Sequence, residues 1–223
     1  MPRPPASETE LLQRADALAG SHLGDIATAH ALPVPPDLRS HKGWIGDLLE
    51  HALGAEAGNA SEPDFPHLGI ELKTIPVDDR GRPRQTTWVC VAPMGVLDPG
   101  TWWASAVRRR LSRVLFVPVL GQGPPAERRC GAPVLWSPDA EQEAVLKADW
   151  EALTELLAEG EVWQWHARHG VALQLRPKAA SARNRRWVTD GEGEWVQTVP
   201  RGFYLRTSFT AGILAAEPRL LHP

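Results

Sequence analysis

One stretch, EPDFPHLGIELKTIPV from Glu62 to Val77, most constrains what this chain can fold into. Within it, residues 69–75 alternate polar and apolar side chains, and a period of two predicts a β-strand. Glu71 and Lys73 therefore project from one face of that strand, about 7 Å apart, while Leu72 lies on the other face. The segment places an acid and a lysine side by side on a strand of a sheet.

A second acid, Asp64, precedes Glu71 and gives the pattern Pro-Asp-x6-Glu-x-Lys. Two carboxylates supply hard oxygen ligands for a divalent metal, and the ammonium of Lys73 can offset charge or orient an attacking water. By itself the pattern is only moderately specific, because a loop aspartate and a Glu/Lys pair at a strand edge have the same spacing. The residues alone leave both readings open.

Length and composition favour an ordinary globular protein. The 223 residues suffice for one domain or two closely fused lobes. The N-terminus lacks the apolar region of a signal peptide, and no apolar run reaches the about 18 residues of a membrane span. Cys90 and Cys130 are too few for a disulfide framework or a zinc site, and Cys90 is expected to be a reduced core thiol. We therefore expect a cytoplasmic protein with no membrane segment.

The charge is unevenly distributed along the chain. A net charge of −3 argues mildly against a nucleic-acid binder. However, residues 1–160 carry 15 Lys/Arg against 22 Asp/Glu, whereas residues 161–223 carry 9 against 5. The C-terminal third is therefore locally basic, as a surface that follows DNA phosphates would be.

The remaining pattern alternates helices and strands. Ser7-x-x-Glu10 is a capping box that begins a helix ending at Gly20. We expect further helices over 21–31, 42–53, 102–110 and from Ser137 to Gly160. Strands are expected over 86–92, 114–119 and 134–136, with a hairpin over 162–175 and two short strands within 191–209. The strand over 86–92 is expected to form a β-hairpin with the Glu71 strand, and the proline-rich residues 1–6 a disordered tail.

Several common sites have no support in the sequence. It contains no internal repeat, P-loop, GxGxxG, G-x-S-x-G or zinc-finger spacing, so neither ATP hydrolysis nor nicotinamide chemistry is indicated. His166 and His169 form an H-x-x-H pattern, which we interpret as the polar face of a hairpin rather than as metal ligands.

Other segments extend the pattern beyond the acid–lysine cluster. DFPHLGIELKTIPVD is followed in order by TTWVCVAP, VLFVPV, GAPVLWSP, ARHG, LRPKAA and PRGFYL. In this order the chain resembles the MutH family of DNA mismatch repair endonucleases, from about Leu11 to Leu214.

The resemblance implies a restriction-endonuclease-like α/β fold of the PD-(D/E)xK type, with a mixed sheet flanked by helices. Residues 7–223 would form one domain with two arms around a DNA cleft. The arm over about 7–110 would carry catalysis, and that over about 111–223 recognition.

The resemblance also implies roles at the acid–lysine cluster. Asp64, Glu71 and the main-chain carbonyl of Leu72 would hold Mg²⁺, for which Mn²⁺ could substitute, and Lys73 would orient or help deprotonate the attacking water. Glu50 lies off the apolar stripe of its helix and by itself suggests only a solvated acid. The family pattern places an acidic residue there, so Glu50 becomes a further catalytic carboxylate.

Two basic positions are assigned in the same way. The resemblance places Lys42 and Gly43, at a helix start, beside a DNA phosphate, a position that suits the free N–H groups of a helix N-terminus. Arg110 belongs to a cationic run that is equally consistent with a solvated face. The family usually carries a lysine close to the active site at this position. Arginine keeps the positive charge but spreads its hydrogen-bond donors over a planar guanidinium, so the role of the lysine does not transfer directly to Arg110.

The DNA-recognition residues come from the C-terminal third. Arg176, Pro177 and Lys178 leave a predicted strand, where a guanidinium could contact guanine O6 and N7. From the residues alone, a surface loop explains them equally well. For Tyr204, the only tyrosine, composition is equally consistent with a residue that caps a core strand. The resemblance assigns all four to DNA recognition, with Tyr204 approaching the target adenine and sensing its N6 methylation.

The activity implied by the resemblance is a nick 5′ to G in GATC, on the unmethylated strand of hemimethylated duplex DNA. The products would carry 3′-hydroxyl and 5′-phosphate ends. MutL would activate the protein after MutS has located a mismatch, and the protein is expected to be a monomer. Two alternatives remain, a stand-alone GATC restriction endonuclease and a catalytically silent DNA-binding subunit.

Overall fold

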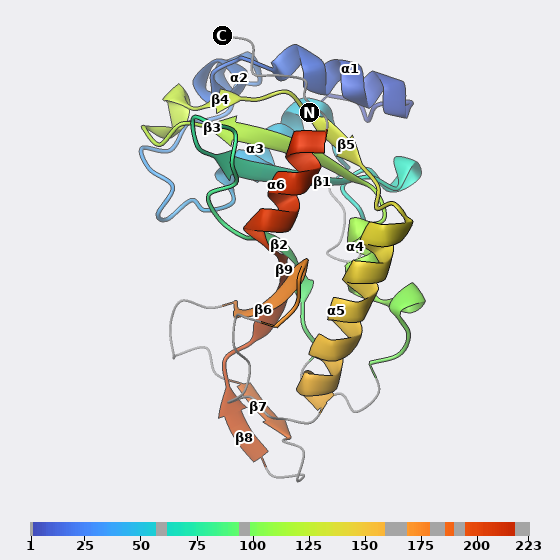
Figure 1. Cartoon of the computed structure of the whole chain (residues 1–223). Coiled ribbons are helices and arrows are strands. Elements are labelled where there is room, and N and C mark those ends of the chain that lie inside the picture. Colours follow the sequence, from blue (N-terminus) through green and yellow to red (C-terminus); the bar gives the residue numbers. More distant parts are fainter. Residues whose placement is uncertain are drawn as a thin grey trace. The chain divides into compact units, whose positions relative to one another are not determined.

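The computed structural model describes residues 2–56, 62–93, 99–158, 169–178, 186–189 and 195–216 (Figure 1). Helices and strands are mixed along the chain, as the predicted α/β class requires. The chain forms two compact units. Unit 1 comprises Met1–Gln85, Arg113–Ser137 and Ala211–Pro223, and unit 2 comprises Thr86–Ser112 and Pro138–Thr210. These units interleave along the sequence and do not follow a boundary near residue 110.

Unit 1 is built around a four-stranded mixed sheet. Its elements are α1 (Glu8–Leu18), α2 (Leu23–Ala29), α3 (Trp44–Leu53), η1 (Pro66–Leu68), β1 (Glu71–Val77), β3 (Val114–Leu120), η3 (Pro125–Glu127), β4 (Arg129–Cys130) and β5 (Val134–Trp136). β3 lies at the centre, parallel to β1 on one side and antiparallel to β4 and β5 on the other. β1 is therefore an edge strand, a position in which Pro76 costs no sheet hydrogen bond.

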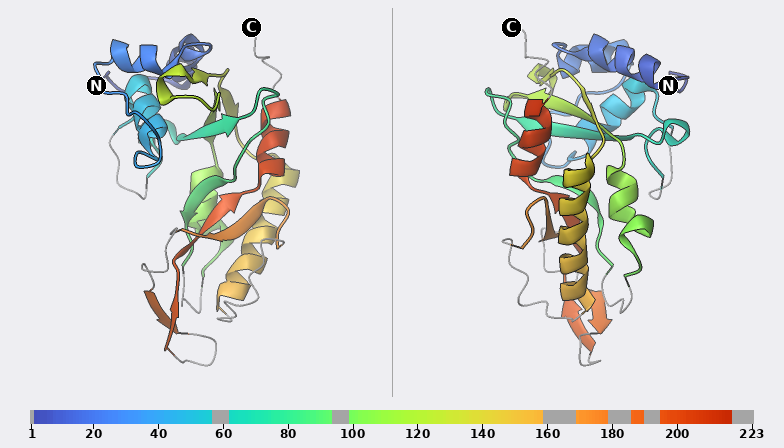
Figure 2. Two further views of the ribbon diagram at one scale, coloured as in Figure 1. Left: turned by 90° about the vertical axis from the view of Figure 1, so that its left-hand side faces the viewer. Right: turned by 45° about the vertical axis from the view of Figure 1, so that its right-hand side comes forward.

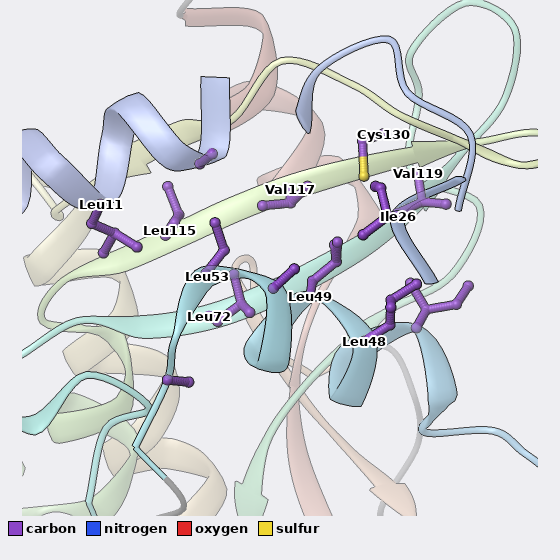
Figure 3. Close-up of a cluster of buried hydrophobic side chains, with 14 of the residues drawn as sticks. Leu11, Ile26, Leu48, Leu49, Leu53, Leu72, Leu115, Val117, Val119 and Cys130 are labelled. Carbon is purple, nitrogen blue, oxygen red and sulfur yellow. The ribbon is translucent and has the colours of Figure 1, made fainter. Parts of the chain in front are cut away.

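Helices α1, α2 and α3 cover one face of this sheet (Figure 2). Leu49 and Leu53 of α3 are fully buried in one cluster with Leu72 of β1 and Leu115 of β3 (Figure 3). Burying a leucine side chain stabilises the fold by about 1.5–3 kcal/mol. This apolar contact fixes α3, and with it Glu50, beside the edge strand.

Two local expectations were wrong. Residues 2–6 are not a disordered tail: Pro5 is buried, its carbonyl is 2.7 Å from His67 Nε2, and Arg14 donates to the Arg3 carbonyl at 2.8 Å. Cys130 rather than Cys90 is the core thiol, since Cys130 is buried and Cys90 is partly exposed. Burial raises the pKa of Cys130 to about 12.

Unit 2 contains a smaller antiparallel sheet in the order β2-β9-β6, with α5 packed against β6. Its elements are β2 (Thr87–Val91), η2 (Trp102–Ala104), α4 (Ala106–Leu111), α5 (Ala140–Ala158), β6 (Leu173–Pro177), β7 (Arg186–Thr189), β8 (Trp195–Thr198) and β9 (Arg201–Leu205). β7 and β8 form a separate two-stranded ribbon. α6 (Thr207–Ala216) follows β9.

The predicted hairpin of the Glu71 strand with the strand over 86–92 was wrong. β1 and β2 belong to different sheets, and the chain after the Asp78 turn meets the end of β1 at an isolated bridge between Val77 and Pro83. Asp78 does close that turn, accepting the N–H of Gly81 on its carbonyl at 2.9 Å. Alternation identified both strands correctly, but it carries no information about which strand pairs with which.

Several element boundaries also differ. The helix expected over 102–110 is divided at Ser105, whose hydroxyl accepts the N–H of Arg108 and caps α4. α5 begins after Asp139 rather than Ser137, because Asp139 accepts the N–H of Gln142 at 2.8 Å. The first half of the hairpin expected over 162–175, including His166, lies outside the described residues. Within the described part of the chain, no helix is long and apolar enough to span a membrane.

Candidate active site and nucleic-acid interface

A closed turn accounts for the six-residue spacing between Asp64 and Glu71. Phe65 and Ile70 hydrogen-bond to each other in both directions, at 2.9 and 3.3 Å, and η1 lies between them. Gly69 ends η1 with φ +66°, in the left-handed region that favours glycine. Because the two ends of the turn pair, Asp64 is brought back beside the start of β1.

Asp64 occupies the open edge of β1. Its Oδ2 accepts the N–H of Leu72 at 2.7 Å, whereas the N–H of Glu71 donates to the Arg113 carbonyl on the β3 side. In a parallel pair the N–H and C=O of one residue point the same way and alternate along the strand. The Leu72 carbonyl therefore faces the same open edge as Asp64. The backbone thus brings together the carboxylate and the carbonyl that were predicted to hold a metal.

Glu71 and Lys73 share the opposite face of β1 from Leu72, as predicted. Lys73 Nζ lies 2.5 Å from Glu71 Oε1, and the two side chains are 12% and 3% exposed. A carboxylate as buried as Glu71 is costly unless a cation or a metal compensates it. Lys73 supplies that compensation here, so the predicted acid–lysine pair is a real, largely desolvated contact.

Glu50 lies near this group on α3. Burial, together with the negative charges of Asp64, Asp47 and Glu71, raises the pKa of Glu50 to about 7, while Lys73 opposes the shift. The carboxyl of Glu50 therefore exchanges its proton near neutral pH. This electrostatic coupling places Glu50 within the same charged group, not on a solvated helix face.

The donor set fits a hard cation. Within the described residues, no three His, Cys, Asp or Glu side chains gather closely enough to hold a metal ion. Asp64 and Glu71 with the Leu72 carbonyl would instead supply three protein oxygens, and Mg²⁺ commonly completes its octahedron with water and phosphate oxygens. The site thus suits a metal that is shared between protein and substrate.

Lys42, Gly43 and Arg110 lie on helix termini. Lys42 is exposed, and Gly43 is the N-cap of α3 with no side-chain capping bond. Both belong to unit 1 with the acid–lysine site, whereas Arg110 lies in the last turn of α4 in unit 2 and is half-buried. Lys42 and Gly43 are accessible to a phosphate.

A second cluster lies on the β2-β9-β6 sheet. Arg176 Cζ is 5.8 Å from the centre of the Tyr204 ring, and Lys178 Nζ is 5.2 Å from that of Trp88. The two rings meet edge to face with centroids 5.1 Å apart. Arg176 also donates to the Thr86 hydroxyl at 2.7 Å. We call Arg176, Lys178, Tyr204 and Trp88 the recognition cluster; its cations are exposed, and its rings hold them without neutralising them.

The backbone fixes this cluster. Lys178, just beyond Pro177 at the end of β6, donates its N–H to the Pro200 carbonyl at 2.7 Å, which ties the exit of β6 to the start of β9. Gly202 of β9 leaves room for Trp88, since a Cβ there would lie 2.1 Å from the indole. Burial raises the pKa of the Tyr204 hydroxyl, which Arg176 opposes, so the phenol stays neutral and able to donate.

Sequence reasoning missed two residues that support the recognition cluster. Trp88 was visible only as an aromatic in the TTWVCVAP strand. Asp149 of α5 is buried and accepts the N–H groups of Val171, Ala172 and Leu173 at 2.6–2.9 Å, holding the start of β6. No sequence signal distinguishes Asp149 from the other acids of this helix.

Comparisons with known proteins agree with this arrangement. The family model for the DNA mismatch repair enzyme MutH matches residues 53–149. The chain is 51% identical over 217 residues to the DNA mismatch repair protein MutH of Serratia proteamaculans, covering 96% of this chain and 95% of that protein. Its identity to the MutH proteins of Klebsiella pneumoniae and Vibrio cholerae is 51% over 221 residues and 52% over 212 residues. The corresponding coverage is 98% and 94% of this chain, and 96% of each relative. The chain therefore belongs to the MutH family of DNA mismatch repair endonucleases, with the restriction-endonuclease-like fold expected of it.

Proposed function

We propose that this protein nicks the unmethylated strand of hemimethylated GATC sites in a Mg²⁺-dependent reaction. The observation that carries the proposal is the convergence of Asp64, Glu71 and Lys73 at one edge strand, with Lys73 Nζ paired to Glu71 and Asp64 bound to the Leu72 N–H. This arrangement combines hard oxygen donors with a positioned ammonium, which suits hydrolysis of a phosphodiester.

Asp64, Glu71 and the Leu72 carbonyl would hold the metal. Bound there, Mg²⁺ would polarise the scissile phosphate and stabilise the charge that develops on its oxygens and on the leaving 3′ oxygen. Mn²⁺ has the same preference for oxygen ligands and could substitute. Glu71 matters twice, since it would bind the metal and also position Lys73.

Lys73 and Glu50 would handle the water and its proton. Lys73 lies in a largely desolvated position, where its ammonium can orient the attacking water toward the phosphate. Glu50, with a pKa of about 7, can accept a proton at neutral pH better than an ordinary glutamate. Attack in line with the 3′ oxygen leaves a 3′-hydroxyl and a 5′-phosphate. Arg110 carries charge on α4 and is proposed only as a phosphate contact.

The recognition cluster would read the site. Arg176, with its forked donors, suits O6 and N7 of guanine, and Lys178 suits a phosphate or a base edge. Pro177 between them fixes the backbone, and Lys42 with Gly43 would bind a phosphate at the start of α3. Tyr204 presents a ring and a neutral hydroxyl that could distinguish an adenine amino group from its N6-methylated form.

We further propose that the protein acts as a cytoplasmic monomer that MutL activates after MutS has located a mismatch. A monomer with one acid–lysine site would cut one strand at a time, which suits a nick rather than a double-strand break. The charge of −3 supports recruitment by a partner over indiscriminate DNA binding.

The test is a nicking assay on supercoiled plasmid with a single GATC site and Mg²⁺, with and without a matching MutL. We expect open-circular product, stimulated by MutL, from hemimethylated and unmethylated plasmid but not from fully methylated plasmid. Linear product without MutL would favour a restriction endonuclease. Equal cutting of all three substrates would contradict the methyl-sensing role of Tyr204. No product under any condition would favour a catalytically silent DNA-binding subunit.

A further inference from the structure

The β7–β8 ribbon presents two tryptophans to solvent. Trp187 pairs with Gln197 and Thr189 with Trp195 in the antiparallel register. Directly opposed residues share a face, as do residues two apart along a strand, so Trp187 and Trp195 lie diagonally adjacent on one face. They are 61% and 67% exposed. On the other face, Thr198 is buried.

This exposure is unusual for large rings. An indole buries more apolar area than almost any other side chain, so leaving two of them in solvent forgoes a substantial stabilisation. Aromatic residues exposed together mark a binding surface more often than tryptophans scattered singly. The aromatic face of the ribbon, defined by Trp187 and Trp195, is therefore a candidate contact surface.

The position of the ribbon in the chain indicates its occupant. It is inserted between β6, which carries Arg176, and β9, which carries Tyr204. The 2.7 Å hydrogen bond from Lys178 N–H to the Pro200 carbonyl holds the two ends of this insertion together, next to the recognition cluster. The chain from Arg176 to Thr189 contains five arginines or lysines and no acid. A ribbon whose two ends are joined beside the exposed cations Arg176 and Lys178 complements a polyanion.

We propose that the aromatic face of the β7–β8 ribbon contacts duplex DNA outside the GATC sequence; this inference rests on the proposed function. A two-stranded ribbon fits the major groove of B-DNA, where apolar side chains contact thymine methyl groups. Trp187 and Trp195 extend the interface beyond the base pairs that the recognition cluster reads. Their contribution is apolar, so it adds affinity without adding ion pairs.

The experiment compares two GATC duplexes, one with about half a helical turn on each side of the site and one with about two turns on each side. Binding of Trp187→Ala/Trp195→Ala is measured against wild type by fluorescence anisotropy of labelled DNA, over a range of salt concentrations. Trp103→Ala is the matched control, because Trp103 is 61% exposed in the same unit but lies outside the ribbon. Thermal unfolding of each variant verifies the fold.

We expect the double variant to bind the long duplex about tenfold more weakly than wild type, because apolar burial is lost, and the short duplex with unchanged affinity. The slope of log affinity against log salt should stay the same, because no phosphate contact is lost. Equal weakening on both duplexes, or no weakening on either, would overturn the proposal. Unchanged binding with loss only of MutL-stimulated nicking would assign the ribbon to a protein partner instead. If the wild type binds neither duplex, the proposed function itself fails.

Discussion

The acid–lysine site of unit 1 and the recognition cluster of unit 2 hold their charges in opposite ways. Glu71 and Lys73 are 3% and 12% exposed and compensate each other directly. Arg176 and Lys178 are exposed and rest on aromatic rings. Charges that perform chemistry gain strength from a low dielectric, whereas charges that read DNA must remain available to it. Changes in the first region should affect turnover, and changes in the second should affect affinity and choice of site.

The largest effect is expected from Lys73→Ala. Removing the ammonium should lower the nicking rate by about 100- to 10,000-fold, because the water loses its positioned partner. DNA binding in Ca²⁺ should persist, as measured by anisotropy. Lys73→Arg keeps a positive charge beside Glu71, so it separates compensation of the Glu71 charge from catalysis. Lys178→Ala removes a lysine from the recognition cluster and controls for the loss of a lysine as such. Nicking at the wild-type rate by Lys73→Ala would contradict the mechanism.

Asp149→Ala tests whether the exposed recognition cluster depends on a buried charge. It would leave the N–H groups of Ala172 and Leu173 buried without an acceptor, at about 1–3 kcal/mol each. We expect the free energy of unfolding to fall by about 2–5 kcal/mol in urea titrations. Glu155→Ala, an exposed acid on the same helix, should change it by less than about 0.5 kcal/mol. Equal stability of the two variants would show that Asp149 does not hold the start of β6.

Arg176→Ala should separate recognition from folding. Arg176 is exposed, so thermal unfolding should match that of wild type, while affinity for GATC falls by about 1–3 kcal/mol. Affinity for duplexes without the site should change much less, and a competition assay between the two measures this. The exposed Arg39→Ala in unit 1 controls for loss of a cation. An equal loss of affinity for duplexes with and without the site would mean that Arg176 contacts a phosphate and not a base.

Tyr204→Phe should have a smaller and narrower effect. It removes only the hydroxyl, so the ring contact with Trp88 and the strand remain. The ratio of nicking rates on hemimethylated and fully methylated GATC should fall by about tenfold or less, equivalent to one neutral hydrogen bond. An unchanged ratio would place the discrimination on another residue.

Glu50→Gln should change how the stability of the protein depends on pH. The pKa of Glu50 is raised from 4.5 to about 7 in the folded protein, so the folded state binds this proton more tightly than the unfolded state. Its contribution to stability is therefore complete below pH 4.5 and is lost as the pH rises through about 7. In urea titrations without metal, the free energy of unfolding of the variant should rise relative to that of wild type as the pH increases from 4.5 to about 7. A constant difference would mean that Glu50 is not the coupled carboxyl.

Much of the candidate site could be predicted from local sequence, and the part that could not depends on pairing. Alternation located the strand of Glu71 and Lys73, the capping box located the start of α1, and the apolar stripe located α3. The turn after that strand suggested a hairpin with the strand over 86–92, which was wrong because β2 joins β9 from a distant part of the chain. Asp149 and Trp88 were missed for the same reason, since each is defined by residues more than 20 positions away.

By itself the sequence determined the chemistry available to this protein: two carboxylates and a lysine at fixed spacing, and a basic, aromatic C-terminal third. Side-chain period and turn propensity are local properties, so they can be recognised in the sequence without knowledge of the fold. Only the tertiary structure decided that β1 is an edge strand, which leaves its open side to Asp64 and the Leu72 carbonyl. Only it placed the tryptophans of β7 and β8 on one face. β1 pairs with β3 and β2 with β9, which are far apart in the sequence, and the side-chain period within one strand does not encode which strand it will join.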